Sequence, residues 1–452
     1  MATKPAIKTL NASGPDIVSA VFASSDVFAN APDITNTSES IRNIGKYIMD
    51  YEPRKNAFIS ALVNRIGMVI ITSKLYTNPL ARFKKGMLEY GETVEEIFVE
   101  LAKPFQFDPA VAETNIFKRE IPDVRAAYHT LNFQKFYKTT ISNDQLRQAF
   151  LSWQGITDLI SRIVDSLYTS MNYDEFLVMK YMIATAALEG NIGGINIPEI
   201  DAANAKSAVS IVKGISNKME FMSSKYNMAG VHNYVNKRDQ IILINSTSDA
   251  IIDVEVLAAA FNMDKAEFMG QRVLVDDFAD IDNERLAMLF ASDPTYIPLT
   301  SEEIAMLKSI PIVLVDAAWF MIFDHYMNMT EQYNGEGLYW NYWLHVWRVF
   351  SYSPFANAVL FTTETPTVTS VTVNPSTATV NKGQSLTLSA DVITKGFASK
   401  KVNWSVNSEI SSISPSGVLT VSADETATSL TVTATSDFDT TKTGTATITV
   451  AN

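Results

Sequence analysis

The chain has 452 residues, 47% of them hydrophobic and 19% charged, with a formal net charge of −13. This length predicts roughly two to four domains, and the apolar content argues against extensive disorder. The acidic balance disfavours binding to phosphate backbones, and the absence of cysteine excludes disulfides, thiolate catalysis and zinc–thiolate sites. Neither a signal peptide nor a membrane-spanning stretch is recognisable, so we expect a protein that is made in a cytoplasm.

Residues 1–60 are expected to form an N-terminal arm, extended and partly mobile, because the first forty are mostly small and polar. Residues 61–103 are expected to form a long hairpin, with strands at 69–76 and 93–99. Its tip is basic and its return is acidic. The tip carries Arg82, Lys84 and Lys85, and the return carries Glu89, Glu92, Glu95 and Glu96.

Residues 142–190 have the clearest helical pattern. Ser142 and Gln145 form a capping-box signature, and apolar residues then recur at helical spacing as far as Leu188. An unbroken helix of this length would be about 65–70 Å long. Such a helix should run along something extended, although a break near 170–172 remains open.

Residues 193–335 alternate helical and strand patterns, which is typical of a mixed α/β domain. Helices are expected near 208–222 and 249–261, and strands at 241–244, 273–275, 312–315 and 319–323. Residues 336–362 follow as a returning strand that contains the aromatic run GLYWNYWLHVWRVF. Spacing alone permits a helix here, but the aromatic and β-branched content favours a strand buried on both faces. Its candidate core residues are Trp340, Tyr342, Trp343 and Trp347.

The composition changes after Phe361: threonine and serine dominate, and short alternating runs are separated by turn residues. Residues 366–452 are therefore predicted to form an immunoglobulin-like β-sandwich around Trp404, of the kind without a cysteine pair. The sharp boundary predicts an independently folding accessory that either stiffens contacts between neighbouring subunits or faces outward. Binding to bacterial surface sugars is a less favoured alternative.

No motif indicates catalysis. The four histidines lack metal-ligand spacing, and neither a phosphate loop nor a nucleophile elbow occurs. The acidic run 276–282 lacks the glycine and glutamate of a calcium loop, so a solvated acidic loop is favoured. A lysine–asparagine crosslink through Lys84 or Lys85 is possible, but a solvated tip that meets a neighbour's acidic surface is favoured. We therefore expect no catalytic residue, no cofactor and no metal.

Several motifs carry a resemblance to a known family. They are FKKG at 83–86, TVEEIF at 93–98, FKREIP at 117–122, AFLSW at 149–153, VEVLAAAFNM at 254–263 and GLYWNYWLHVW…FANAV at 337–359. Together they resemble the major capsid protein of small podophages of the phi29 type, an HK97-like fold. The SVTVNPSTATV and VNWSV stretches are similar to bacterial group 2 immunoglobulin-like (BIG2) domains. The segment 280–309 looks like an insertion, and nothing is carried over onto it.

The resemblance implies an α+β subunit that self-assembles into the hexamers and pentamers of an icosahedral or prolate shell around double-stranded DNA, without sequence-specific binding. It implies that 61–103 is the E-loop that reaches a neighbour, 104–192 the peripheral domain with its spine helix, 193–335 the axial domain, and 336–362 the strand returning to the peripheral domain. It also implies a scaffolding protein and a portal, with a head fibre or decoration protein as a further candidate partner, but no membrane. The candidate contacts between subunits are Arg82, Phe83, Lys84, Lys85, Glu89 and Glu92.

Two other classes compete with a virion protein. The sandwich alone suggests a bacterial surface adhesin or carbohydrate-binding protein, and a cytosolic enzyme with an appended binding domain is the third class. The missing signal peptide argues against the adhesin, and the missing catalytic motif argues against the enzyme.

Overall fold

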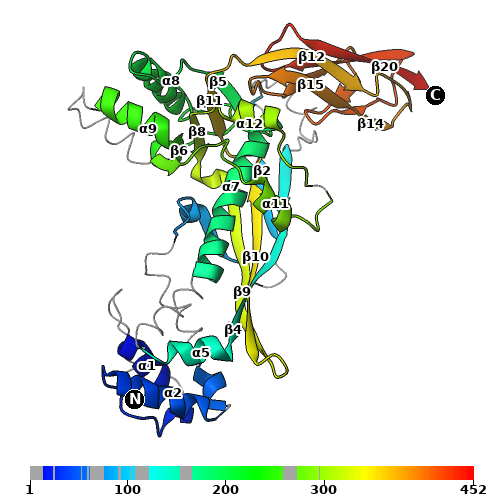
Figure 1. The fold of residues 1–452 in the computed structure, drawn as a ribbon. Coiled ribbons are helices and arrows are strands. Elements are labelled where there is room, and N and C mark those ends of the chain that lie inside the picture. Colours follow the sequence, from blue (N-terminus) through cyan, green and yellow to red (C-terminus); the bar gives the residue numbers. More distant parts are fainter. Residues whose placement is uncertain are drawn as a thin grey trace. The chain divides into compact units, whose positions relative to one another are not determined.

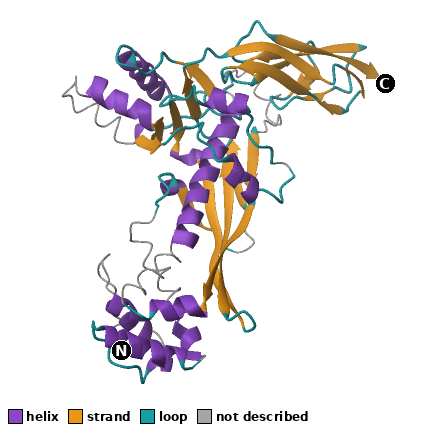
Figure 2. Ribbon diagram, in the orientation of Figure 1, coloured by secondary structure: helices purple, strands orange, loops and turns teal. Residues whose placement is uncertain are grey.

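The computed structural model divides the chain into two compact units. Figures 1 and 2 show its helices and strands. The first unit comprises Met1–Glu92, Thr130–Val178 and Ile322–Phe350, and the second comprises Thr93–His129, Met179–Met321 and Ser351–Asn452. The structure describes residues 14–23, 26–51, 53–58, 61, 76–89, 93–102, 104–105, 107, 122–152, 165–257, 272–294 and 296–451.

The first unit combines short helices with a four-stranded sheet. The helices are α1 (Gly14–Phe22), η1 (Asp26–Phe28), α2 (Ser38–Met49), η3 (Ala81–Phe83) and α5 (Asn143–Ala149). The sheet has the order β1 (Lys84–Met87), β9 (Phe320–Asn334), β10 (Tyr339–Tyr352) and β4 (Phe133–Ser142). β10 runs antiparallel to β4, and β1 lies parallel to β9.

One apolar core joins the helices of the first unit to its sheet. Ile41, Ile44 and Ile48 recur on one face of α2 and pack in the same cluster as Trp340 and Tyr342 of β10. Thr37 caps the start of α2 by accepting a hydrogen bond from the Ser40 amide. The expected extended arm is therefore wrong for the described part of residues 14–58, because a helical apolar face occurs there and is buried. Residues 1–13 lie outside the description.

The second unit is built on a five-stranded mixed sheet. Its order is β5 (Gly193–Asn196), β11 (Ala358–Thr362), β8 (Ile312–Asp316), β6 (Gln240–Asn245) and β7 (Arg272–Val275). Helices α8 (Ala205–Lys218) and α9 (Ser246–Ile252) lie beside this sheet (Figure 1). They share a core with Val359, Leu314 and Ile242, which lie in one row across the sheet. The π-helix Asp253–Leu257 continues α9, and α11 (Asn283–Leu289) and α12 (Ser301–Leu307) follow β7.

Residues 367–451 form a sandwich of strands in the second unit. The strands are β12 (Thr367–Asn374), β13 (Thr377–Asn381), β14 (Ser385–Thr387), β15 (Ser389–Lys395), β16 (Val402–Val406), β17 (Ser412–Ile413), β18 (Val418–Thr420), β19 (Ser429–Ser436) and β20 (Thr443–Ala451). One sheet has the order β13-β20-β19-β16. Its apolar core is made by residues of the sandwich alone, among them Val373, Leu430 and Ile448. The predicted β-sandwich is therefore confirmed as an all-β domain over the described residues 367–451.

The long helix expected over 142–190 is interrupted. α5 ends at Ala149, and 150–152 are not helical. Farther along, the π-helix Asp165–Thr169 leads directly into α7 (Ser170–Leu188), so the chain remains helical at 170–172, where a break was considered. The stretch 153–164 lies outside the described residues.

The other expectations are met in part. The strands near 241, 273 and 312 are present, whereas β9 begins at Phe320 and runs on to Asn334. Most of β9 belongs to the first unit, so the division lies near residue 321 and not at the expected 335. The returning segment consists of two strands, β10 and β11, which belong mainly to different units. Strands β3 (Val124–His129) and β4 were not predicted.

Candidate assembly interface

A two-stranded ribbon in the second unit has one docked face and one open face. β2 (Val94–Val99) pairs antiparallel with β3, so that Ile97 lies opposite Ala126 and Val99 opposite Val124. Side chains alternate between faces along both strands, because successive residues of a strand point to opposite sides. We call these two strands the β2–β3 ribbon.

The docked face of the β2–β3 ribbon packs on the second unit through one ring pair and a polar cluster. Phe98 stacks on Phe355 with ring centroids 5.5 Å apart. The Glu96 carboxylate accepts a hydrogen bond of 2.8 Å from Ser353 Oγ and lies 3.3 Å from Nε2 of buried His129. His129 Nδ1 lies 2.7 Å from Ser351 Oγ. These partners hold the ribbon in a fixed orientation against its own unit.

The open face of the ribbon is exposed and mostly apolar, and its one charged member in β2, Glu95, accepts a hydrogen bond of 3.0 Å from the Tyr128 hydroxyl. Ile97 is 59% exposed, and Val99, Val124 and Tyr128 are similarly open. Farther along the chain, Phe107 is also exposed, at 89%. A two-stranded ribbon is marginal by itself, and contiguous exposed apolar surface marks a site of protein contact. This face is therefore the strongest candidate interface in the described part of the chain.

The expected hairpin is corrected by this pairing. The return strand at 93–99 is present as β2, but its partner is β3, and the expected partner at 69–76 lies almost wholly outside the description. β3 could have been found from the sequence, because Val124, Ala126 and Tyr128 alternate with Arg125, Ala127 and His129.

The basic residues expected at the hairpin tip are not at a tip. Lys84 starts β1 and lies inside an ion cluster of the first unit, with Nζ 2.6 Å from Asp324 Oδ2 and 3.2 Å from Glu175 Oε2. Phe83 is buried, whereas Arg82, Lys85 and Glu89 are exposed. Glu92 lies outside the described residues. The solvated tip is thus wrong for Lys84, and contact with a neighbour stays a prediction for the others.

The ion cluster of the first unit is closed by Arg348 of β10. Arg348 and Glu175 are each 2% exposed, and Arg348 Nη1 lies 2.7 Å from Glu175 Oε2. Arg348 Nε also donates to Asp324 Oδ1 at 2.6 Å, and Asn78 Nδ2 donates to Glu175 Oε1 at 2.8 Å. Two cations thus face two carboxylates, and the cluster joins β1, α7, β9 and β10.

The candidate core strand is confirmed as a strand, with unequal faces. Trp340 and Tyr342 are buried in the core of the first unit, together with Leu344 and Val346. Trp343 and Trp347 lie on the other face and are half-buried. The Trp343 ring lies beneath Lys138 Nζ at 5.6 Å, and the Trp347 ring lies 5.0 Å from that of Tyr326. The rings of this strand therefore contact protein of the same chain.

The acidic run 276–282 begins with an exposed residue, as expected of a solvated loop, since the Asp276 side chain is 47% exposed, but Asp276 also has a structural partner. Its carboxylate oxygens lie 2.9 and 2.8 Å from Nζ of Lys180, a lysine of α7 that is only 2% exposed. Asp282 caps α11 by accepting a hydrogen bond from the Arg285 amide. Among the described residues, no group of three or more histidine or acidic side chains could hold a metal ion, and no helix could cross a membrane.

Comparisons with known proteins agree with this geometry. The family model for the Phi29-like phage major capsid protein matches residues 22–362, and that for the bacterial Ig-like domain (group 2) matches 367–450. The major capsid protein of Bacillus phage B103 is 36% identical over 420 residues, covering 91% of this chain and 87% of that protein. That of Bacillus phage GA-1 is 34% identical over 424 residues, covering 91% and 84%.

A solved capsid has the same fold. The capsid structure of Staphylococcus phage Andhra matches with a TM-score of 0.50 and 16% identity, covering 65% of this chain and 86% of that chain. With the family match, this makes the molecule a phage shell protein of the HK97-like class with an appended Ig-like domain. The chain belongs to the Phi29-like phage major capsid protein family. It is a major capsid protein of a tailed phage, a component of the virion, and copies of it assemble into the capsid.

Proposed function

We propose that this subunit forms the hexamers and pentamers of an icosahedral or prolate shell and that the open face of the β2–β3 ribbon is a principal contact with the neighbouring subunit. The observation that carries the proposal is the row of exposed apolar side chains on a ribbon whose other face is fully engaged. Burial of a large apolar side chain contributes about 1.5–3 kcal/mol, so several such residues give a strong contact between copies.

The same proposal includes the partners and the course of assembly. The subunit is made in the host cytoplasm, assembles with a scaffolding protein, leaves one vertex to a portal and encloses double-stranded DNA. A head fibre or decoration protein is a further partner. Its role is structural and not enzymatic, and its acidic balance supports a container that does not grip its DNA. The adhesin is disfavoured because the family match covers the part of the chain outside the Ig-like domain.

Ile97→Asp tests the ribbon. The charge on the open face is expected to reduce the yield of closed shells at least about tenfold, because one desolvated carboxylate opposes the contact by more than 1.4 kcal/mol. Yield is measured by gradient sedimentation and electron microscopy of the full chain coexpressed with its scaffolding protein. Tryptophan fluorescence of the unassembled subunit checks its fold.

Ile393→Asp is the matched control. Ile393 lies on β15 of the sandwich and is 54% exposed, a fraction similar to the 59% of Ile97. It is expected to leave the shell yield unchanged. A normal yield of closed shells from the Ile97 variant would show that the β2–β3 ribbon is not an essential contact between subunits.

A further inference from the structure

One loop of the Ig-like domain is built into the rest of the second unit. Residues 396–401, which we call the anchor loop, join β15 to β16. The Phe397 carbonyl accepts a hydrogen bond of 2.8 Å from the Gly194 amide of β5, at the free edge of the five-stranded sheet. Lys401 Nζ donates to the Ser224 carbonyl at 2.7 Å. The anchor loop therefore holds two segments that are about thirty residues apart in the sequence.

Both sides of this contact are shaped for it. A Cβ at Gly194 would lie 2.7 Å from the Phe397 carbonyl oxygen, and one at Gly190 would lie 2.8 Å from Lys400 Cγ. Phe397 itself has a φ of 64°, which is unfavourable for a side chain of this size, yet it is buried. Such a conformation persists only where the surroundings determine it. The Ig-like domain, expected as an independently folding accessory, is therefore also docked on the rest of the second unit.

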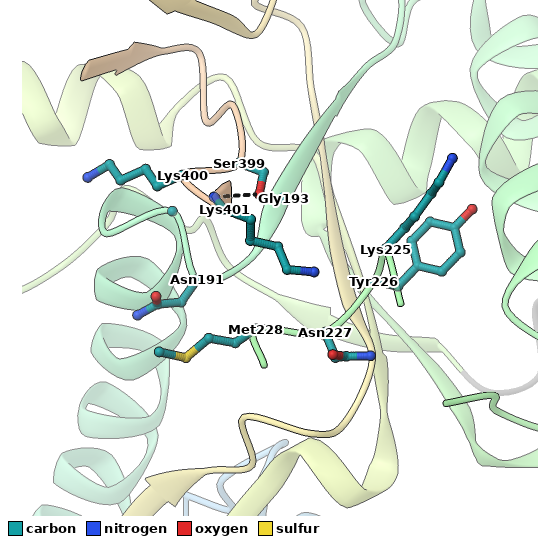
Figure 3. Close-up of a pocket in the computed structure, with 10 residues that line it drawn as sticks. Asn191, Gly193, Lys225, Tyr226, Asn227, Met228, Ser399, Lys400 and Lys401 are labelled. Atoms are coloured by element: carbon teal, nitrogen blue, oxygen red, sulfur yellow. Dashed lines mark hydrogen bonds between the residues drawn. The ribbon is translucent and has the colours of Figure 1, made fainter. Parts of the chain in front are cut away.

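The space around Lys401 is a small cavity of about 210 Å³ without an acidic residue in its lining. Figure 3 shows the Lys401 side chain extending into this space, whereas Lys225 and Lys400 point away from it. Burial lowers the pKa of Lys401. The charge of Asp437 opposes this shift without forming an ion pair with Lys401, and the Ser224 carbonyl accepts the hydrogen bond of the ammonium group. Lys401 thus attaches the anchor loop to the loop that contains Ser224.

That loop is held together by its own hydrogen bonds. Residues 223–233, which we call the relay loop, are closed by backbone hydrogen bonds between Ser223 and Asn233. Within the loop, the buried Asn227 side chain donates to the Val231 carbonyl at 2.7 Å and accepts from its amide at 2.9 Å. These bonds cross-link the relay loop, so we expect a displacement of its Ser224 end to be transmitted to the residues near Val231.

The far side of the relay loop holds the base of the β2–β3 ribbon. Arg125 of β3 donates from Nη1 to the Ala229 carbonyl at 2.5 Å. Glu100, which follows β2, accepts from the His232 amide at 3.2 Å and lies 2.8 Å from His232 Nδ1. The relay loop thus contacts the anchor loop of the Ig-like domain at Ser224 and the ribbon at Ala229 and His232.

We propose that Lys401 is a positioning residue for assembly: through the relay loop, the Ig-like domain fixes the orientation of the β2–β3 ribbon. The proposal rests on the ribbon's role as the contact between subunits. The domain thereby affects shell formation from within its own subunit, whatever it contacts outside. Lys401 touches no neighbouring subunit in this scheme, since it acts on the ribbon only through Ser224 and the relay loop.

Hydrogen exchange in the full-length unassembled subunit tests the relay. Lys401→Met is expected to speed amide exchange about tenfold or more in both the relay loop and the ribbon, the size expected when a hydrogen bond to a charged group is lost. Lys401→Arg retains a donor and should restore protection. Lys395→Met replaces an exposed lysine of β15 and should change neither segment.

A second variant approaches the relay from its other end. Arg125→Met lies outside the Ig-like domain, and because coupling is reciprocal it should speed exchange at the anchor loop as well as at the relay loop. Unchanged exchange at the anchor loop in this variant, or an unchanged ribbon in Lys401→Met, would overturn the proposal. Because hydrogen exchange is measured on the unassembled subunit, its result tests the coupling through the relay loop independently of the Ile97 experiment, which tests the ribbon as a contact.

Discussion

At the scale of single residues, the first unit depends on a buried pair of opposite charges. Replacing Arg348 by methionine leaves Glu175 buried with one cation fewer, which typically costs about 3–5 kcal/mol. Denaturant unfolding of the unassembled subunit, followed by tryptophan fluorescence, is expected to show that loss. Arg238→Met is the control, because the Arg238 side chain is 82% exposed. A loss of unfolding free energy as small as that of the control would contradict this prediction, because it would mean that Glu175 becomes hydrated when Arg348 is absent.

The Asp324 carboxylate in the same cluster predicts that the stability of the fold depends on pH in the acidic range. Burial alone would raise its pKa, but Arg348 and Lys84 hold the pKa of Asp324 below its ordinary value. A carboxyl with a lowered folded pKa stabilises the fold above its unfolded pKa of about 3.9, and this contribution is lost as the pH falls through the folded value. Asp324→Asn should therefore be less stable than the parent at neutral pH, and the gap should narrow below about pH 4. A gap that stays constant in unfolding titrations would contradict this assignment.

At the scale of elements, local patterns predict where an element begins better than where it ends. The capping box of Ser142 and Gln145 is present, so the start of α5 follows from sequence alone. Its end does not, because Leu146 and Phe150 keep helical spacing across the break. Phe150 leaves the helix to pack on Phe58, with ring centroids 5.3 Å apart, and only the tertiary core supplies that reason.

Strand partners also lie beyond local patterns. The alternation in β2 and β10 predicts both strands and their buried faces, but the partner of β2 is about thirty residues away, and β10 pairs with β4, about two hundred residues away, as well as with the preceding β9. Lys84 and Asp276 show the same limit for charges. Each looks like a solvated residue in its own stretch, and each has a partner roughly ninety or more residues distant. The candidate interface was therefore foreseen in its β2 half and missed in its β3 half.

At the scale of the whole molecule, the Ig-like domain has a core of its own and a docked surface. The family boundary at residue 367 and the core made only of sandwich residues indicate that it can fold alone. The docking contacts lie mainly in the anchor loop. A further contact is made just before β12, where the Glu364 carbonyl accepts a hydrogen bond of 2.8 Å from the Asn196 side chain of β5. Its fold and its attachment are therefore separable properties.

A fragment of residues 363–452 is expected to unfold in one cooperative transition, because its apolar core needs no residue from the remainder of the chain. The chain shortened after Glu364 should remain soluble but lose its heat stability by a few degrees, since the Gly194 amide and the Ser224 carbonyl then lose their partners. Scanning calorimetry of the two fragments and the intact chain measures both effects. If the isolated sandwich is unfolded, its stability comes from docking and not from its own core. If it folds while the shortened chain melts like the parent, the anchor loop is a contact without energetic weight.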